Sequence, residues 1–301
     1  MPIRVDRIES LADQEGPLHL ALGVFDGVHK GHQEVIDRAV RAAKKDGGKA
    51  FVVTFSPHPI RVIAPDKAPS SLLATLDEKA AVMKGLGVDG LLAIPFDKEF
   101  AKMPAEEFVT RICRADIDSI AVGEDWRFGS KRLGDINLLR EMGERLGFKL
   151  DAVSPVMWDG ERISSTRIRQ AIRDGNFKAV ENMLGRAYEV SGTVIEGRKL
   201  GRKLGFPTAN LQLGKLQAPK DGVWAVVVDG DRPGVANLGM RPTVAGQERL
   251  LEVHLFDFSG DLYGKTIRVR FVKHLREEMK FGSLEELQDQ ISRDVIEARK
   301  I

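Results

Sequence analysis

The segment Leu18–His32, LHLALGVFDGVHKGH, carries residue types suited to phosphate chemistry. An apolar run leads into a glycine-rich turn, and His29 and His32 stand three residues apart just before a helical pattern. Backbone N–H groups at a helix start and the positive end of the helix dipole together form an anion site. Two imidazoles there could stabilise charge that develops on a phosphate during transfer. The segment therefore predicts a nucleotide-phosphate site, although a capped turn with surface histidines shows the same pattern.

A structural zinc site is disfavoured at this turn, because no cysteine or further histidine lies at ligand spacing. Two other glycine-containing stretches resemble nucleotide-binding motifs but do not meet their requirements. Gly85–Gly90 matches G-x-G-x-x-G, but it follows a helix and precedes a strand, the reverse of the dinucleotide context. Gly264–Thr266 resembles the end of a P-loop, but Ser259 stands where the first glycine is required.

Two further stretches offer groups for phosphates and cations. Ser164–Arg169, SSTRIR, places hydroxyls and guanidinium groups at a second helix start, where they could grip triphosphate oxygens. An ordinary helix cap with a solvated basic face fits this stretch equally well. Gly197–Asn210 is a basic, glycine-rich loop that ends with Thr208 and Asn210, whose neutral oxygens suit a hard cation. The alternative for this loop is a flexible basic hairpin.

Glu252 lies in LLEVHLF, a run that is otherwise rich in apolar residues. A carboxylate at this place could accept a proton from a substrate hydroxyl. Glu252, His254 and Phe256 share one face of the predicted strand, however. The pattern alone therefore slightly favours a surface glutamate on a barrel.

The first 185 residues alternate between strand-like and helix-like segments. This alternation predicts a parallel sheet covered by helices on both faces. The expected strands are Leu18–Val24, Ala50–Phe55, Gly90–Ile94, Ser119–Val122 and Lys149–Val153. The expected helices are His32–Lys45, Leu76–Gly85, Pro104–Cys113 and Asp135–Leu146, followed by two short ones that end near Gly185. We place the domain boundary there, between residues 1–185 and 186–301.

From Ala187 onward the pattern changes to short strands at close spacing, which predicts a small closed barrel. The expected strands are Tyr188–Glu196, Thr208–Leu213, Val223–Asp229, Gly234–Leu238, Leu250–Phe258 and Thr266–Lys273. One helix should follow. Ser283 and Glu286 form a capping box for it, and its apolar stripe consists of Leu284, Leu287, Ile291 and Val295.

Composition narrows the class of protein. The chain has 301 residues, of which 43% are hydrophobic and 30% charged, with a net charge of +2. Such a small charge provides no strong field for nucleic acid. The single Cys113 excludes an internal disulfide, and neither a signal peptide nor an apolar run of about 20 residues is visible. We expect a cytoplasmic protein without nucleic-acid or membrane partners, whose oligomeric state the sequence does not define.

Taken together, these motifs resemble the family of bifunctional bacterial riboflavin kinases/FAD synthetases. In the first half the resemblance is carried by GVFDGVHKGH (23–32), TFSPHP (54–59), VGEDWRFGSKRLGD (122–135) and ISSTRIR (163–169). In the second half it is carried by GRKLGFPTAN (201–210), GVWAV (222–226), NLGMRPT (237–243), LEVHLFDF (251–258) and LREEMKF (275–281). Departures from the usual pattern are Ser56, Trp126, Glu196 and Trp224.

The resemblance implies a Rossmann-like α/β nucleotidylyltransferase domain that makes FAD from FMN and ATP. It further implies a small six-stranded antiparallel flavokinase barrel with a terminal helix, which makes FMN from riboflavin and ATP. Both activities would use Mg²⁺, with ATP as co-substrate and FMN and FAD as products. The implied partners are thus the small molecules riboflavin, FMN and ATP.

The resemblance also implies roles for individual residues. His29 and His32 would act in FAD formation, and Glu252 would be the base of the kinase step. Thr208 and Asn210 would hold the metal. ATP would contact Gly23, Phe25, Gly31, Ser164, Thr166, Arg167 and Arg169 in the first site and Gly201, Lys203 and Gly205 in the second. Flavin would contact Asp125, Arg127, Phe128, Arg276 and Phe281.

Overall fold

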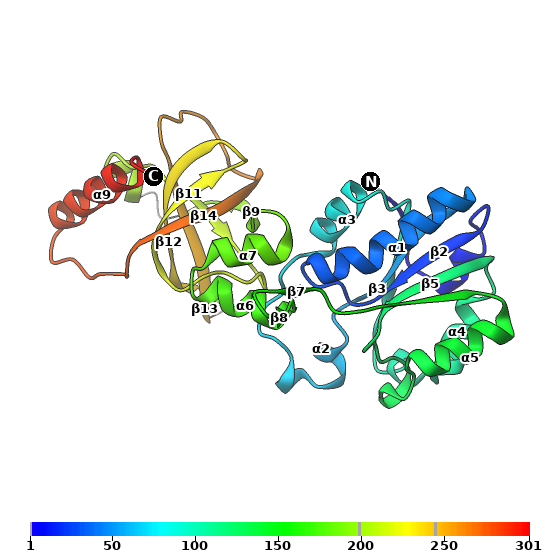
Figure 1. The fold of residues 1–301 in the computed structure, drawn as a ribbon. Coiled ribbons are helices and arrows are strands. Elements are labelled where there is room, and N and C mark those ends of the chain that lie inside the picture. The colour runs from blue at the N-terminus through cyan, green and yellow to red at the C-terminus, as the bar shows by residue number, and fades with distance from the viewer. Residues whose placement is uncertain (1, 198–199, 244–245) are drawn as a thin grey trace. The chain divides into compact units, whose positions relative to one another are not determined.

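The computed structural model describes residues 2–197, 200–243 and 246–301, and the chain divides into two compact units, Met1–Ser165 and Thr166–Ile301 (Figure 1). This division falls before the boundary that we expected after residue 185. It assigns most of α6 (Ser165–Arg173) and all of α7 (Phe177–Leu184) to the second unit. The boundary at residue 185 therefore stays a prediction.

The first unit is built on a sheet in which every neighbouring pair of strands is parallel, in the order β1-β4-β3-β2-β5-β6. The strands are β1 (Ile3–Val5), β2 (Leu18–Leu22), β3 (Lys49–Ser56), β4 (Gly90–Pro95), β5 (Ile117–Gly123) and β6 (Lys149–Val153). The predicted parallel sheet is confirmed. The edge strand β1 was not predicted, because three residues with mostly exposed side chains carry no periodic signal.

Helices cover both faces of this sheet, as predicted. They are α1 (Lys30–Asp46), α3 (Leu76–Gly85), α4 (Ala105–Ile112) and α5 (Ile136–Leu146). The single turn α2 (Ile60–Ile63) buries none of its residues. The apolar residues of α1 and α3 pack with Ala21 and Val52 on one face. Those of α4 and α5 pack with Leu20 and Val53 on the other. Alternate residues of each strand thus supply two separate cores, which fix the strand ends where a ligand site can form. A short hairpin of β7 (Met157–Trp158) and β8 (Glu161–Arg162) precedes α6.

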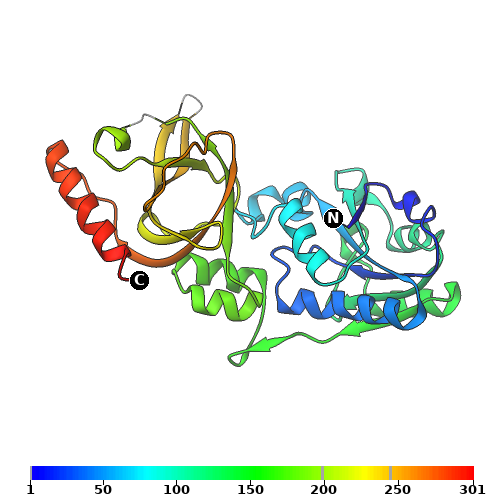
Figure 2. The ribbon, with the colours of Figure 1, turned by 90° about the horizontal axis from the view of Figure 1, so that it is seen from above.

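The second unit contains a closed antiparallel barrel in the order β10-β13-β12-β11-β14-β9, whose strands curve into a ring in Figure 2. Its strands are β9 (Glu189–Ile195), β10 (Ala209–Gln212), β11 (Gly222–Val228), β12 (Arg232–Thr243), β13 (Gly246–Leu255) and β14 (Thr266–Arg276). The predicted six-stranded barrel is confirmed. A single turn of helix, α8 (Leu200–Lys203), lies between β9 and β10.

The terminal helix α9 (Leu284–Ala298) begins at the predicted cap, where the Ser283 side chain accepts a hydrogen bond from the Glu286 N–H. The Glu286 carboxylate accepts from Gly282 N at 2.8 Å instead of from Ser283, so the capping box is shifted by one residue. The predicted apolar stripe is wrong at Leu284, which is exposed. Val295 of the stripe and Ala298 pack against barrel residues such as Val223 and Val235. An ion pair adds to this packing: Arg276 of β14 donates to both oxygens of the buried Asp294, at 3.0 and 2.7 Å.

Breaking this ion pair should destabilise the barrel unit. We expect Asp294→Asn to lower the free energy of unfolding by about 3 kcal/mol, because it leaves the partly buried Arg276 guanidinium without its countercharge. Denaturant unfolding measures the change. Asp289→Asn, an exposed position on the same helix, is the matched control and should remain near wild type. Equal stability of the two variants would contradict the anchoring role.

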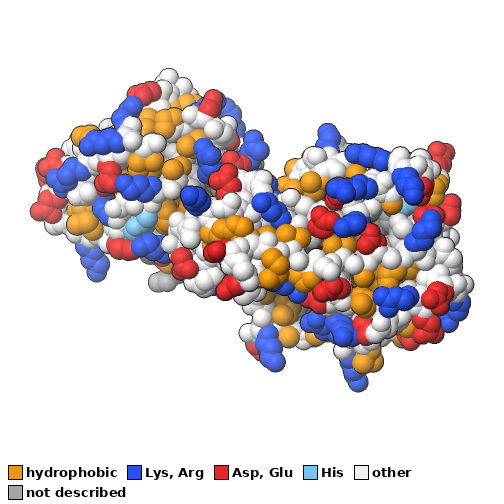
Figure 3. All heavy atoms as spheres, in the orientation of Figure 1, with side chains coloured by type: hydrophobic (Ala, Val, Ile, Leu, Met, Phe, Trp, Pro, Cys, Tyr) orange, Lys and Arg blue, Asp and Glu red, His pale blue; other side chains and the backbone are white. Residues whose placement is uncertain are grey.

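The surface carries no simple signature of a large partner on the face in view. Lys and Arg side chains alternate with Asp and Glu over each unit, and apolar side chains lie between them (Figure 3). Within the described residues, no helix combines the length and apolar character needed to cross a membrane.

Candidate active sites

The loop between β2 and α1 places both predicted histidines at the start of a helix. His29 is the N-cap of α1, and its Nδ1 accepts a hydrogen bond from the His32 backbone N–H at 3.3 Å. The two imidazoles stack with their ring centroids 3.5 Å apart. Phe25 packs edge-on against His32 at 5.4 Å. The predicted pair is therefore a preformed unit at the positive end of a 17-residue helix.

The same loop contains unusual backbone geometry. Phe25 and Val28 have positive φ angles of 51° and 44°, although neither is a glycine. Such a conformation is costly for a β-branched residue, and it persists only where the surroundings enforce it. Gly23 is required beside this turn, because a Cβ there would lie 2.9 Å from the Phe25 ring. Strain of this kind is typical of functional loops.

Side chains from other elements fix the loop. The Val24 carbonyl accepts from Lys79 Nζ on α3 and from Thr54 Oγ1 on β3, both at 2.9 Å. The Asp26 carbonyl accepts from Ser165 Oγ at 3.0 Å. The buried Asp26 carboxylate accepts from Leu73 N at 3.0 Å. Sequence reasoning missed Lys79 and did not connect Thr54 of TFSPHP or Ser165 of SSTRIR with this loop, because only the long-range fold brings these three residues to it.

His32 is held in its neutral form. Burial lowers its pKa well below the ordinary value of 6.5, and the nearby His29, Lys79 and Arg162 lower it further. Its Nδ1 is buried and has no hydrogen-bond partner within the part of the chain that is described. A neutral imidazole keeps one N–H to donate and one lone pair to accept. His32 can therefore contact a phosphate oxygen without changing its charge near neutral pH.

This shift makes the stability of the first unit depend on pH. Below about pH 6.5 the unfolded chain binds a proton at His32 that the folded chain does not bind, so the free energy of unfolding falls as pH drops. The slope reaches about 1.4 kcal/mol per pH unit. We expect His32→Asn to lose less stability than wild type between pH 7 and 5.5 in denaturant titrations. Identical pH slopes for the two proteins would contradict the neutral state.

The predicted flavin residues of the DWRFG loop, Asp125, Arg127 and Phe128, each contact another side chain of the first unit. Asp125 forms a two-pronged ion pair with Arg162 of β8, which holds the pKa of the Asp125 carboxyl below its usual value. Arg127 pairs at 2.7 Å with Asp135, the N-cap of α5. Phe128 is buried beneath Trp126, whose ring stacks on it at 4.5 Å. Trp126 thus presents the more accessible aromatic face.

The predicted SSTRIR stretch, Ser164–Arg169, contains Ser165 and runs into the first turn of α6. Ser164 is partly buried, and Thr166, the first residue of the second unit, is exposed in the first turn of α6. Arg167 is partly buried and Arg169 is buried. Their roles stay predictions.

In the barrel, strand register brings the predicted kinase residues together. Asn210 of β10 pairs with Glu252 of β13, and Glu252 also pairs with Asn237 of β12. Directly paired residues point to the same face with their Cβ atoms about 5 Å apart. Asn210, Glu252 and Asn237 therefore form one polar row, on the face opposite the buried Leu251 and Val253. Sequence reasoning singled out Asn210 and Glu252 but missed Asn237.

The glycine-rich loop leaves space beside this row. A Cβ at Gly197 would lie 2.4 Å from Asn210 Nδ2, and one at Gly201 would lie 3.3 Å from Thr208 Oγ1. Thr208 and Asn210 line a cavity of about 620 Å³. The cavity is also lined by Arg202, Asp261 and Tyr263, none of which was predicted. Neutral oxygens beside a phosphate-sized space fit Mg²⁺, which shares its shell with substrate phosphates and water.

The remaining predicted residues lie elsewhere in the second unit. Lys203 is exposed at the end of α8, and Gly205 has a φ of +85° in the turn that follows. Arg276 is bound to Asp294 and also lies over the Phe281 ring at 5.9 Å. Arg198 and Lys199 of the basic loop lie outside the described residues.

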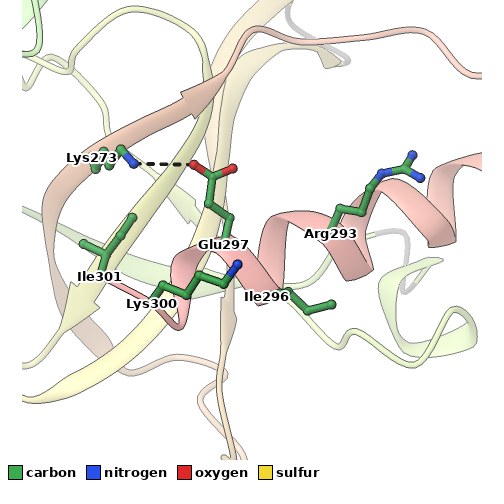
Figure 4. Close-up of a pocket in the computed structure, with 6 residues that line it drawn as sticks. All are labelled: Lys273, Arg293, Ile296, Glu297, Lys300 and Ile301. Atoms are coloured by element: carbon green, nitrogen blue, oxygen red, sulfur yellow. Dashed lines mark hydrogen bonds and ion pairs between the residues drawn. The ribbon is translucent and has the colours of Figure 1, made fainter.

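A second hollow, of about 570 Å³, lies along α9 (Figure 4). It is lined by Lys273, Arg293, Ile296, Glu297, Lys300 and Ile301. Lys273 and Glu297 form an ion pair across it at 3.5 Å. It contains none of the predicted site residues, so we do not assign the chemistry to it.

A glycine-rich loop that leads into a helix on a parallel sheet, followed by a closed barrel with a cavity at Thr208 and Asn210, is typical of two-domain enzymes that act on nucleotide phosphates. The profile of the FAD synthetase family matches residues 12–167, and that of the riboflavin kinase family matches residues 184–301. The chain belongs to the family of bifunctional riboflavin kinase/FMN adenylyltransferases.

Individual relatives agree with this assignment. The bifunctional riboflavin kinase/FMN adenylyltransferase of Escherichia coli K12 is 42% identical over 297 residues, covering 97% of this chain and 94% of that protein. The one from Pseudomonas fluorescens is 43% identical over 286 residues, covering 93% and 91%. A crystal structure described as a macrolide-efflux protein from Streptococcus pneumoniae has a TM-score of 0.85 at 33% identity, covering 100% of this chain and 99% of its own.

Proposed function

We propose that this chain converts riboflavin to FMN in the barrel and FMN to FAD in the first unit, using ATP in both steps. The polar row of Asn210, Glu252 and Asn237 supports the proposal, because Glu252, the proposed base, pairs directly with Asn210, a proposed metal ligand. The stacked histidines at the start of α1 support the second activity. The substrates are small molecules.

In the kinase step, the ribityl hydroxyl of riboflavin transfers its proton to Glu252 as its oxygen attacks the γ-phosphorus of ATP, and ADP leaves. Thr208 and Asn210 would hold Mg²⁺, which supplies charge neutralisation to the phosphates. Gly201, Lys203 and Gly205 line the phosphate loop, and Arg276 and Phe281 border the flavin pocket.

In the adenylylation step, the FMN phosphate already carries the negative charge of a nucleophile, so no general base is needed. Its oxygen attacks the α-phosphorus of ATP, and pyrophosphate leaves. Catalysis then consists of positioning and charge stabilisation. His29, His32, Ser164, Thr166, Arg167 and Arg169 contact the ATP phosphates, together with the loop residues Gly23, Phe25 and Gly31. Asp125, Arg127 and Phe128 belong to the flavin side.

An end-point assay tests both activities. The purified chain is incubated with riboflavin, ATP and Mg²⁺, and flavins are separated by chromatography. FMN followed by FAD is the expected result. FMN alone would contradict the first-unit assignment and make Ser56 the first residue to replace. The absence of both products, also with reduced flavin, would contradict the proposed function as a whole.

A further inference from the structure

An arginine lies between two carboxylates beside the polar row of the barrel. Arg241 of β12 donates from Nε to Glu252 Oε1 at 3.0 Å. Its Nη1 donates to Glu278 Oε1, also at 3.0 Å. Glu278 comes from the segment between β14 and α9, so Arg241 links β12 and β13 to a part of the second unit that is distant from them in sequence.

The β12 backbone is shaped to receive Glu278. Asn237, Gly239 and Arg241 alternate along the strand and so share a face. A Cβ at Gly239 would lie 2.3 Å from Glu278 Oε1, so a side chain at this position would displace the carboxylate. Asn237 Nδ2 donates to the same oxygen at 3.3 Å. The Glu278 carboxylate therefore lies against β12 and accepts from Arg241 Nη1, while Glu252 accepts from Arg241 Nε.

The guanidinium is a permanent cation in this place. Burial opposes its charge, but the hydrogen bonds to Glu252 and Glu278 outweigh that effect and raise the pKa of Arg241. One carboxylate oxygen of Glu252 is fixed by this cation. Within the described residues, the other oxygen, Oε2, accepts no hydrogen bond and is free to take a proton.

We propose that Arg241 is the positioning residue of the kinase site. It fixes Glu252 Oε1 so that Oε2 faces the ribityl hydroxyl, and Glu278 fixes Arg241 in turn. This inference rests on the proposed kinase function of the barrel. In the step itself, the hydroxyl proton moves to Oε2, the hydroxyl oxygen bonds to the γ-phosphorus, and the bond to the ADP oxygen breaks.

Steady-state kinetics of FMN formation test the role. Arg241→Met should lower kcat about 10²-fold, since misplacing a catalytic group by about 1 Å costs this much, and should change the KM for riboflavin less than about threefold. Arg241→Lys should restore part of kcat. In a Glu252→Gln background, Arg241→Met should have little further effect, because the group that it positions is gone. FAD formation from supplied FMN reports only that the first unit is intact, so riboflavin-binding titrations and denaturant unfolding of each variant report on the fold of the barrel.

The matched control is Arg249→Met. Arg249 has a side-chain exposure of 32%, against 33% for Arg241, and pairs with Asp221 rather than with Glu252. It should stay within about twofold of wild type. An additive loss in the double variant, an effect on KM alone, or an equal loss at Arg249 would overturn the inference. Wild-type protein that forms no FMN would instead refute the proposed kinase function.

Discussion

Replacing Glu252 by glutamine is expected to lower the rate of FMN formation by about 10²–10⁴-fold, the usual contribution of a general base. Glutamine keeps the size of the side chain but cannot accept the hydroxyl proton. Riboflavin binding should be largely retained, because the shape of the side chain is kept and the proposed flavin residues Arg276 and Phe281 are unchanged. Kinetics of FMN formation and flavin-binding titrations measure the two effects separately.

The same chain provides controls for this variant. FAD formation from supplied FMN should continue at the wild-type rate, because its site lies in the other unit. Glu189→Gln, another strand carboxylate in the barrel, should leave FMN formation within about twofold of wild type. Near-normal turnover by Glu252→Gln would return Glu252 to the role of a surface residue on the barrel.

Replacing His29 is expected to impair FAD formation and to leave FMN formation intact, the reverse of the result at Glu252. His29→Ala should lower FAD formation by about 10²–10³-fold, since loss of one donor to a charged transition state costs this much. FMN formation should continue. His29 also caps α1, so loss of the cap could itself reduce activity.

His29→Asn separates the two effects, because asparagine is among the best N-cap residues but lacks the imidazole. If catalysis needs the imidazole, both variants should lose FAD formation equally, and only the alanine variant should lose stability. Full activity in His29→Asn would show that capping is the whole contribution of this residue.

The fold was predictable where patterns are local. The buried β2, its glycine-rich turn and the amphipathic α1 are consecutive in sequence, so their chemistry could be inferred together. Lys79 could not be connected with this loop, because its contact with Val24 spans 55 residues. It resembles any helix lysine until the fold buries it. The ion pair of Asp125 with Arg162 was missed for the same reason.

Glu252 shows more clearly what a local sequence pattern cannot predict. Its alternation with buried neighbours predicts only a face of a strand, and the residues alone slightly favoured a surface position. Strand register supplies the missing information by setting Asn210 on one side and Asn237 on the other. Pairing between distant strands is a property of the closed barrel and leaves no local pattern. The family resemblance was therefore needed to single out this residue.

The polar row of Asn210, Glu252 and Asn237 determines where the barrel can tolerate inserted residues. Side chains of a strand alternate between faces, so one residue inserted in β13 ahead of Leu251, with the preceding residues kept in register, would turn the Glu252 carboxylate towards the barrel interior and Leu251 outwards. Insertions in β13 should thus abolish FMN formation. The turn between β11 and β12, where Gly230 has a φ of +96°, bears no such constraint. Peptides for labelling or immobilisation can therefore be inserted at the turn between β11 and β12 without moving Glu252 out of the polar row.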